Sequence, residues 1–188
     1  MSKKVLFIIL GIVVLLLIWV WTGYNGLVRA RAGVDGAWAQ VETQYQRRFD
    51  LVPNLVSTVQ GAAAFEQNTF VAVTQARTQW MSAGADRAAK ISAAENVDSA
   101  LSRLLVTFEN YPTLQATQAF RDLMTQLEGT ENRIAVARKD FNDSVQSYNV
   151  LVTVFPRMIL ARLFGFTSEP FFQAAEAAAE APRVDFTK

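Results

Sequence analysis

The residues most able to do chemistry are concentrated in one short stretch, RRFDLVPNLV, at residues 47–56. In this stretch Asp50 has the character of a general base, and Arg48 beside it could hold an anionic substrate. A hydrolase or lyase of this kind needs a second carboxylate in the same cleft, for which Glu109 and Glu131 are the candidates. Because one acid without a placed partner is a weak signal, a carboxylate-based enzyme is the third-ranked hypothesis.

The composition of the chain removes most other catalytic chemistry. Its 188 residues include no histidine and no cysteine, so the usual general base, metal ligand and thiolate nucleophile are missing together. The net charge is only +1, which argues against the basic surface that a nucleic-acid-binding protein presents. We therefore expect no catalysis, no cofactor, no metal site and no nucleic-acid partner.

The same stretch has a structural interpretation, which we prefer. Asp50 has the type and position of a helix N-cap, and Pro53 would then lie in the first turn, where its missing N–H costs little. If one helix instead runs through, the Pro53 ring opposes the carbonyl of Phe49 and kinks the helix. Both versions predict a change of direction near residues 49–53, with the two preceding arginines pairing with acids or capping carbonyls.

An apolar run near the N-terminus predicts a membrane anchor. The run VLFIILGIVVLLLIWVW, residues 5–21, carries no charge, and as a helix extended to Tyr24 it covers most of the ~30 Å hydrocarbon core of a bilayer. Trp19, Trp21 and Tyr24 would lie at one membrane interface. A cleaved signal peptide is the alternative, because two lysines precede the run. We prefer the anchor, because no small-residue cleavage site follows closely.

The positive charges on the two sides of the apolar run are nearly balanced, so they give little indication of which side of the membrane the body occupies. Lys3 and Lys4 precede the apolar run, whereas Arg29 and Arg31 follow it. The lysines abut the run and the arginines stand further away. The positive-inside rule therefore leans weakly towards an inside N-terminus and an outside body.

Beyond residue 24 the apolar periodicity is helical throughout. Spacings of three and four residues predict one helix face over residues 34–52 and an eight-turn helix over residues 51–80, which ends at the loop around Gly84. A shorter helix runs over residues 97–108 and stops at Tyr111-Pro112, because a residue before proline is pushed out of the helical region.

The most regular pattern is a heptad seam in the second half of the chain. Its members are Phe120, Leu127, Ile134, Phe141 and Tyr148 on one track, with Leu123, Ala137 and Leu151 on the neighbouring track. An isolated amphipathic helix cannot bury such a stripe, so partner helices must run along it. We therefore predict an all-α fold, with an N-terminal transmembrane helix followed by an antiparallel bundle of three to four long helices.

A polar line accompanies this seam. Arg138, Asn142 and Asn149 share one face of the predicted helix, because they are four and seven residues apart. Such a line is either a ligand groove or a device that fixes helix register. We favour the register role, since buried amides and paired arginines fix register at some cost in stability.

The segment at residues 155–166, FPRMILARLFGF, is unusually apolar and must be covered by something. Packing against the end of the bundle is the preferred explanation. The alternative is a self-association or membrane-surface patch, in which Leu160 and Phe164 face the partner and Arg157 and Arg162 face headgroups.

Separated blocks along the chain form one ordered pattern. They are Tyr24-Asn25-x-Leu27-Val28, Trp38-Ala39, Arg48-x-Asp50-Leu51-Val52-Pro53-Asn54-Leu55-Val56, Gly61, Glu109-Asn110-Tyr111-Pro112-x-Leu114-x-Ala116, Glu131-Asn132-Arg133-Ile134-Ala135-Val136-Ala137-Arg138, Phe141-Asn142, Tyr148-Asn149 and Phe155-Pro156. From about residue 5 to about residue 172, this pattern resembles the LemA family of membrane-anchored bacterial proteins. The last residues, QAAEAAAEAPRVDFTK, match no pattern of that family.

The resemblance implies an α-helical bundle behind one N-terminal membrane helix, with no established catalytic residues. It implies a part in organising membrane compartments for some relatives. It also implies an outside N-terminus and a cytoplasmic bundle, opposite to the lean from charge. Structural or interaction candidates within the matching blocks are Arg48, Asp50, Pro53, Asn54, Tyr111 and Pro112.

The chain is expected to comprise an anchor at residues 1–24, a helical bundle at 25–172 and an alanine-rich tail at 173–188. The leading hypothesis is a single-pass protein of the bacterial inner membrane, held by the lipid bilayer, which self-associates as a scaffold or adaptor. The second is a regulatory subunit that docks a membrane enzyme or protease. That hypothesis predicts one stoichiometric protein partner instead of a large homo-oligomer.

Overall fold

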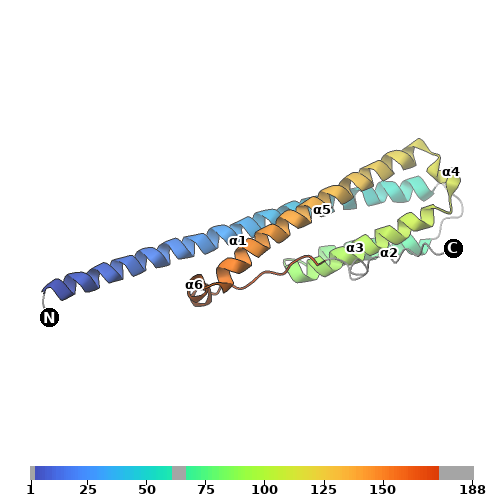
Figure 1. The fold of residues 1–188 in the computed structure, drawn as a ribbon. Helices are drawn as coiled ribbons and strands as arrows, with labels where there is room; N and C mark the ends of the chain where they lie inside the picture. The colour runs from blue at the N-terminus through green and yellow to red at the C-terminus, as the bar shows by residue number, and fades with distance from the viewer. Residues whose placement is uncertain (1–2, 61–66, 174–188) are drawn as a thin grey trace, which may run out of the picture. The chain divides into compact units, whose positions relative to one another are not determined.

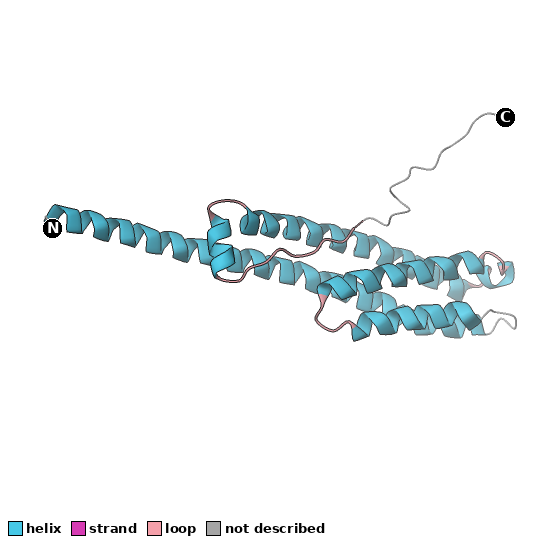
Figure 2. Ribbon diagram, turned by 90° about the horizontal axis from the view of Figure 1, so that it is seen from below, coloured by secondary structure: helices cyan, strands magenta, loops and turns pink. Residues whose placement is uncertain are grey.

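The computed structural model describes residues 3–60 and 67–173, and every regular element in these ranges is a helix. The helices are α1 (Lys3–Gln60), α2 (Gln67–Ser82), α3 (Arg87–Phe108), α4 (Pro112–Gln115), α5 (Gln118–Thr153) and α6 (Arg157–Leu163), labelled in Figure 1. Four of them are long and two are short, as the view coloured by secondary structure also shows (Figure 2). The predicted all-α fold is confirmed.

The chain forms two compact units, which share α1 and α5. The first, here called the anchor unit, consists of Met1–Thr43 and Ala135–Phe171. The second, here called the bundle unit, consists of Gln44–Ile134 and Phe172–Lys188. The anchor unit therefore holds most of α1, the second half of α5 and α6. The bundle unit holds the end of α1, then α2, α3, α4 and the first half of α5.

In the anchor unit, α1 and α5 lie antiparallel and bury one apolar stripe against the other. Trp38 of α1 meets Phe141 of α5 edge to face, with 5.2 Å between ring centroids. Buried residues follow helical spacing on both helices, at Leu27, Val34, Trp38 and Val41 on α1 and at Ala137, Phe141, Val145, Tyr148 and Val152 on α5. The part of the heptad seam in this unit, at Phe141 and Tyr148, is thus buried within the same chain.

In the bundle unit, a cluster of aromatic rings joins α1 to α2. Tyr45 stacks on Trp80 at 4.4 Å between centroids, and Phe49 meets the edge of the same indole at 6.1 Å. The chain then turns from α2 into α3 through Gly84, whose φ of +60° is the left-handed conformation that glycine tolerates. Asp86 caps α3 by accepting the N–H groups of Ala88 and Ala89.

Two local predictions about α1 and α2 are wrong. Asp50 is not an N-cap, because α1 runs unbroken from Lys3 to Gln60 with Pro53 inside it. The eight-turn helix over residues 51–80 does not exist as one element either, since residues 51–60 end α1 and residues 67–80 belong to α2. The physical reason is packing, because Phe49, Val52 and Leu55 continue the buried stripe of α1 across the proline. The kink at Pro53 stays a prediction.

The other boundaries agree more closely with the sequence. The third predicted helix ends at Phe108, just before Tyr111 and Pro112, and Pro112 occupies the first turn of α4. The fourth corresponds to α5, on which all five members of the main heptad track are buried. The predicted tail from residue 174 onward lies outside the described residues.

Candidate membrane-interface site and buried ion cluster

The N-terminal part of α1 leaves its apolar side chains uncovered. Every large apolar residue from Val5 to Ile18 is exposed, and no part of the most hydropathic window of this helix is buried within the chain. A core helix of a soluble protein would bury such residues. By length and composition this part of α1 can cross a membrane, so it is a candidate membrane anchor.

Helix α6 packs directly on the end of this apolar run. Leu160 is only 1% exposed, and it approaches Gly23 so closely that a Cβ at residue 23 would lie 2.4 Å from the Leu160 Cδ1 atom. Tyr24 meets Phe164 at 4.9 Å and Phe166 at 5.9 Å between ring centroids. The absence of a side chain at residue 23 therefore lets α6 seat against α1 at the predicted membrane boundary.

This position corrects part of the patch hypothesis. Leu160 was expected either to pack on the bundle or to face a partner, and it is a core residue of the anchor unit. Phe164 differs, because it contacts Tyr24 and remains partly exposed. Several of its neighbours are more exposed still, notably Phe155 at 72% and Leu163 at 71%. The segment is thus half packed and half open.

The chain after α6 is held by polar contacts with both long helices of the anchor unit. The Asn149 side chain donates to the Glu169 carbonyl at 2.9 Å and accepts the Glu169 N–H at 2.8 Å. The Glu169 carboxylate also pairs with Arg31 of α1 at 2.9 Å. Asn149, expected to fix helix register or line a groove, therefore fixes the returning segment. Arg138 and Asn142 are half-buried on α5, and their register role stays a prediction.

A second polar cluster lies inside the bundle unit, centred on Arg48. This residue is 5% exposed, and its guanidinium donates to Asp98 of α3 at 2.9 Å and to Glu131 of α5. The Tyr45 hydroxyl donates to the other oxygen of Asp98 at 3.4 Å. One arginine of α1 thereby joins two further helices, and the predicted pairing of Arg48 with acids is confirmed.

The three acids proposed for catalysis have separate environments. Asp50 is exposed and accepts a hydrogen bond from Gln46 at 2.8 Å, while Glu131 is engaged by Arg48. Glu109 is exposed next to α3 and lines a shallow groove between α3 and α5. Within residues 3–60 and 67–173, no three acidic side chains converge as metal ligands would.

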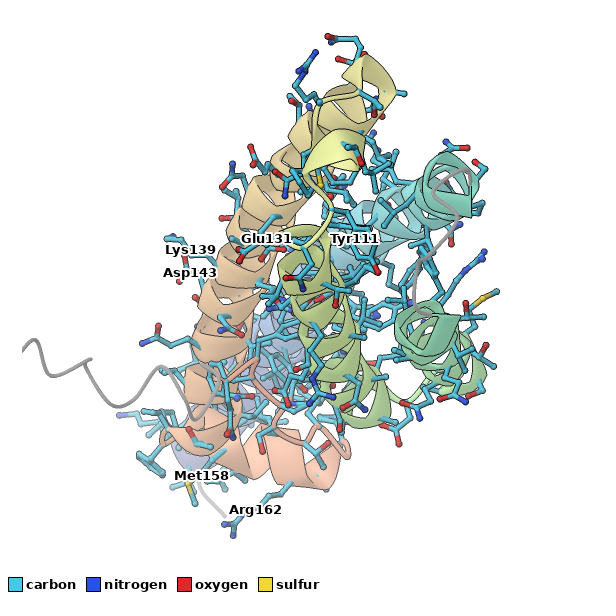
Figure 3. The ribbon with its side chains drawn as sticks, turned by 90° about the vertical axis from the view of Figure 1, so that its right-hand side faces the viewer. Tyr111, Glu131, Lys139, Asp143, Met158 and Arg162 are labelled. Atoms are coloured by element: carbon cyan, nitrogen blue, oxygen red, sulfur yellow. The ribbon has the colours of Figure 1, made fainter. Side chains whose placement is uncertain are left out.

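The remaining candidates are placed as helix-end or surface residues. Pro53 and Asn54 are exposed on α1, and Tyr111 is half-buried immediately before α4. On the surface of α5, Lys139 donates to Asp143 at 2.6 Å, and the two side chains are labelled in Figure 3. The hydrogen bond to Asp143, followed by the charge of that carboxylate, raises the pKa of the Lys139 ammonium.

Sequence reasoning missed Asp98, Glu169 and Gly23. Asp98 had a usable signal, because it stands directly beside Val97 on the buried stripe of α3. Glu169 had none, since its partners Asn149 and Arg31 are distant in the sequence. Gly23 lies just after the apolar run, and nothing in the neighbouring sequence indicates a role for a glycine there. Its role follows only from the close approach of α6.

Comparison with known protein sequences finds a family and several relatives. A model of the LemA family matches residues 37–186. The expectation that the last residues, from 173 onward, lie outside the family pattern is therefore wrong for residues 173–186. The magnetosome proteins MamQ 1 and MamQ 2 of Paramagnetospirillum magneticum are each 28% identical to the chain over 179 residues, covering 82% of the chain and 66% of the relative. Protein LemA of Metamycoplasma hominis is 24% identical over 152 residues, covering 81% of the chain and 69% of the relative. The chain thus spans slightly less than two thirds of the length of the MamQ relatives, and none of these names describes a catalytic activity.

Proposed function

This chain belongs to the LemA family, and from that premise we propose that it is a membrane-anchored helical scaffold whose copies associate at a bacterial cell membrane. In this proposal α1 crosses the bilayer once, and the rest of the chain binds other proteins without carrying out chemistry. The observation that carries the proposal is the uncovered apolar surface of α1, which continues without a linker into a packed helical body.

The main track of the heptad seam, from Phe120 to Tyr148, is already buried within the chain, so a contact between copies needs another surface. A better surface is the groove of about 570 Å³ between α3 and α5 in the bundle unit. Val106, Phe108, Phe120 and Met124 contribute its apolar lining, and exposed Val106 stands at its edge. Glu109, Arg121 and Glu128 give it charges of both signs, which suits contact with an identical copy.

Replacing Val106 with arginine tests this assembly. A buried charge at a contact between copies would be strongly unfavourable, so we expect the mass of the detergent-extracted particle to fall from several copies to one. Native mass spectrometry of the intact particle measures the copy number. The matched control is Val136→Arg, since Val136 is a similarly exposed valine on α5 outside the groove.

The outcomes separate the hypotheses. A wild-type particle that is a bare monomer contradicts the scaffold proposal. One foreign protein in fixed stoichiometry would instead favour the regulatory subunit that docks a membrane enzyme or protease. Equal effects of Val106→Arg and Val136→Arg would show that copies do not associate through this groove.

A further inference from the structure

The anchor unit exposes a second set of apolar side chains, outside α1. Crossing of the membrane by α1 does not explain their exposure. The exposed side chains belong to the end of α5 and to α6 and the segments that flank it. They are Val150, Val154, Phe155, Ile159, Leu163 and Phe164. Three of them, Val150, Val154 and Phe155, line one groove. Exposed apolar side chains grouped in this way mark a binding surface.

The contacts of α6 set the level of this surface along α1. Leu160 and Phe164 lie against Gly23 and Tyr24, which follow the apolar run directly. If α1 spans the bilayer as proposed, the surface lies where the hydrocarbon core meets the headgroups. Trp19 of the anchor itself lines a groove there, together with Val154 and Phe155.

The dimensions and lining of this groove suit a lipid chain. Its volume is about 480 Å³, within the ~300–1,000 Å³ range of small-molecule sites. Trp19, Val150, Val154, Phe155 and Pro156 line it, and Arg157 is the charged residue among its lining. An apolar groove with one cationic rim fits an amphiphile that carries an anionic head.

The charge of the segment supports an anionic headgroup. Residues 150–168 contain two arginines, Arg157 and Arg162, and no acid. Both side chains are exposed, and Arg162 extends away from α6 in Figure 3. Guanidinium groups bind phosphate oxygens through paired hydrogen bonds, whereas the exposed phenylalanine and leucine side chains favour the acyl boundary.

We infer that α6 and the adjoining groove form a binding site for an anionic phospholipid. One acyl chain lies against Trp19, Val154 and Phe155, and the headgroup phosphate lies within reach of Arg157 and Arg162. Bound lipid would thereby hold the base of the anchor unit at the membrane surface. The inference rests on the proposed membrane anchoring, but it assigns a separate ligand to residues outside the anchor.

The test measures which lipid surrounds α6 in nanodiscs of phosphatidylcholine mixed with phosphatidylglycerol. Because the chain has no cysteine, Leu163→Cys carries a single fluorophore. Acyl-chain nitroxides are placed on either lipid, and fluorescence quenching by each is compared. We expect stronger quenching by labelled phosphatidylglycerol. Since a basic residue near an anionic surface contributes roughly a fivefold preference, the ratio should fall about fivefold for each of Arg157→Gln and Arg162→Gln.

Two controls separate charge from folding. Arg103→Gln with Arg133→Gln removes the same net charge as the two α6 substitutions together, from exposed positions of the bundle unit outside its groove, and should leave the ratio unchanged. Replacing both Arg157 and Arg162 with lysine keeps the charge and should keep most of the preference. Circular dichroism of every variant confirms that the helices are intact.

A second label, on Gly11→Cys within the apolar run, distinguishes failure of this inference from failure of the anchor. Quenching at residue 11 without quenching at residue 163 overturns the lipid site and leaves the anchor in place. No quenching at either position refutes both. Equal quenching by the two lipids, or energy transfer between labels on two copies at residue 163, would also overturn the inference. The latter would show that a second copy covers α6.

Discussion

The anchor unit and the bundle unit use the same two long helices in different ways. In the anchor unit, α1 and α5 meet through apolar side chains such as Trp38 and Phe141, and Asn149 and Arg31 hold the segment after α6. In the bundle unit, where α2 and α3 join them, a buried arginine contacts acids on two helices. The Trp38–Phe141 contact removes apolar surface from water, whereas the Arg48 contact must keep a buried cation beside two carboxylates, so truncating a residue should cost packing in the first case and a charge partner in the second.

The largest expected effect tests whether the two units are independent. Phe141→Ala in the anchor unit and Phe108→Ala in the bundle unit each remove a fully buried ring, at a cost of about 3–5 kcal/mol. Because their ring contacts, Trp38 and Phe120, lie within the same unit, we expect each loss of protection to stay in its own unit. Hydrogen exchange with mass spectrometry measures this. Equal loss throughout both units for either variant would mean one cooperative block.

A smaller effect is expected for the arginine that distinguishes the bundle unit. Arg48→Met removes the buried cation that contacts Asp98 and Glu131. The cost should be about 2 kcal/mol, below that of a fully buried pair, because Asp98 is 25% and Glu131 is 54% exposed. Chemical denaturation measures the free energy of unfolding. Arg47→Met, at the exposed neighbouring position, should change it by less than about 0.5 kcal/mol. Equal changes in the free energy of unfolding for the two variants would show that the contacts of Arg48 with the acids do not stabilise the fold.

The smallest expected effect compares two fully buried tyrosines, one in each unit. Tyr45→Phe removes the hydroxyl that donates to Asp98, so it should cost about 1 kcal/mol. The buried Tyr148 hydroxyl has no hydrogen-bond partner among the described residues, so Tyr148→Phe should be neutral or stabilising by about 1 kcal/mol. The same denaturation experiment compares them. Destabilisation by Tyr148→Phe as large as that by Tyr45→Phe would contradict the contrast.

The sequence predicted those features that depend on neighbours along the chain. The heptad track from Phe120 to Tyr148 corresponds to α5, because a periodic stripe in a long uninterrupted segment leaves few alternatives. The apolar run from Val5 predicted an uncovered helix for the same reason. The prediction of a helix start at Asp50 was wrong, because the local preference of Asp50 and Pro53 for that position was outweighed by the burial of Phe49 and Leu55 on a continuous helix.

The candidate site depended instead on contacts between distant residues. The pairing of Arg48 with an acid was predictable from its buried helix face, but the identity of Asp98 as its partner was not. The seating of Leu160 on Gly23 was equally hidden, since it required the return of the chain from α5 to the start of the body. Contacts of this kind follow from topology, which local periodicity does not specify.

α1 passes from its candidate membrane anchor into the packed body without interruption. The number of residues between two positions on this helix therefore fixes the angle between their side chains about the helix axis. One residue inserted at position 22 would rotate everything before it by about 100° relative to Gly23 and shift it by about 1.5 Å along the axis. Trp19 would leave the groove beside Phe155, and only an insertion close to whole turns would restore it. The rotation of the apolar run about the helix axis, relative to the body, is therefore fixed by the sequence as firmly as the length of the run.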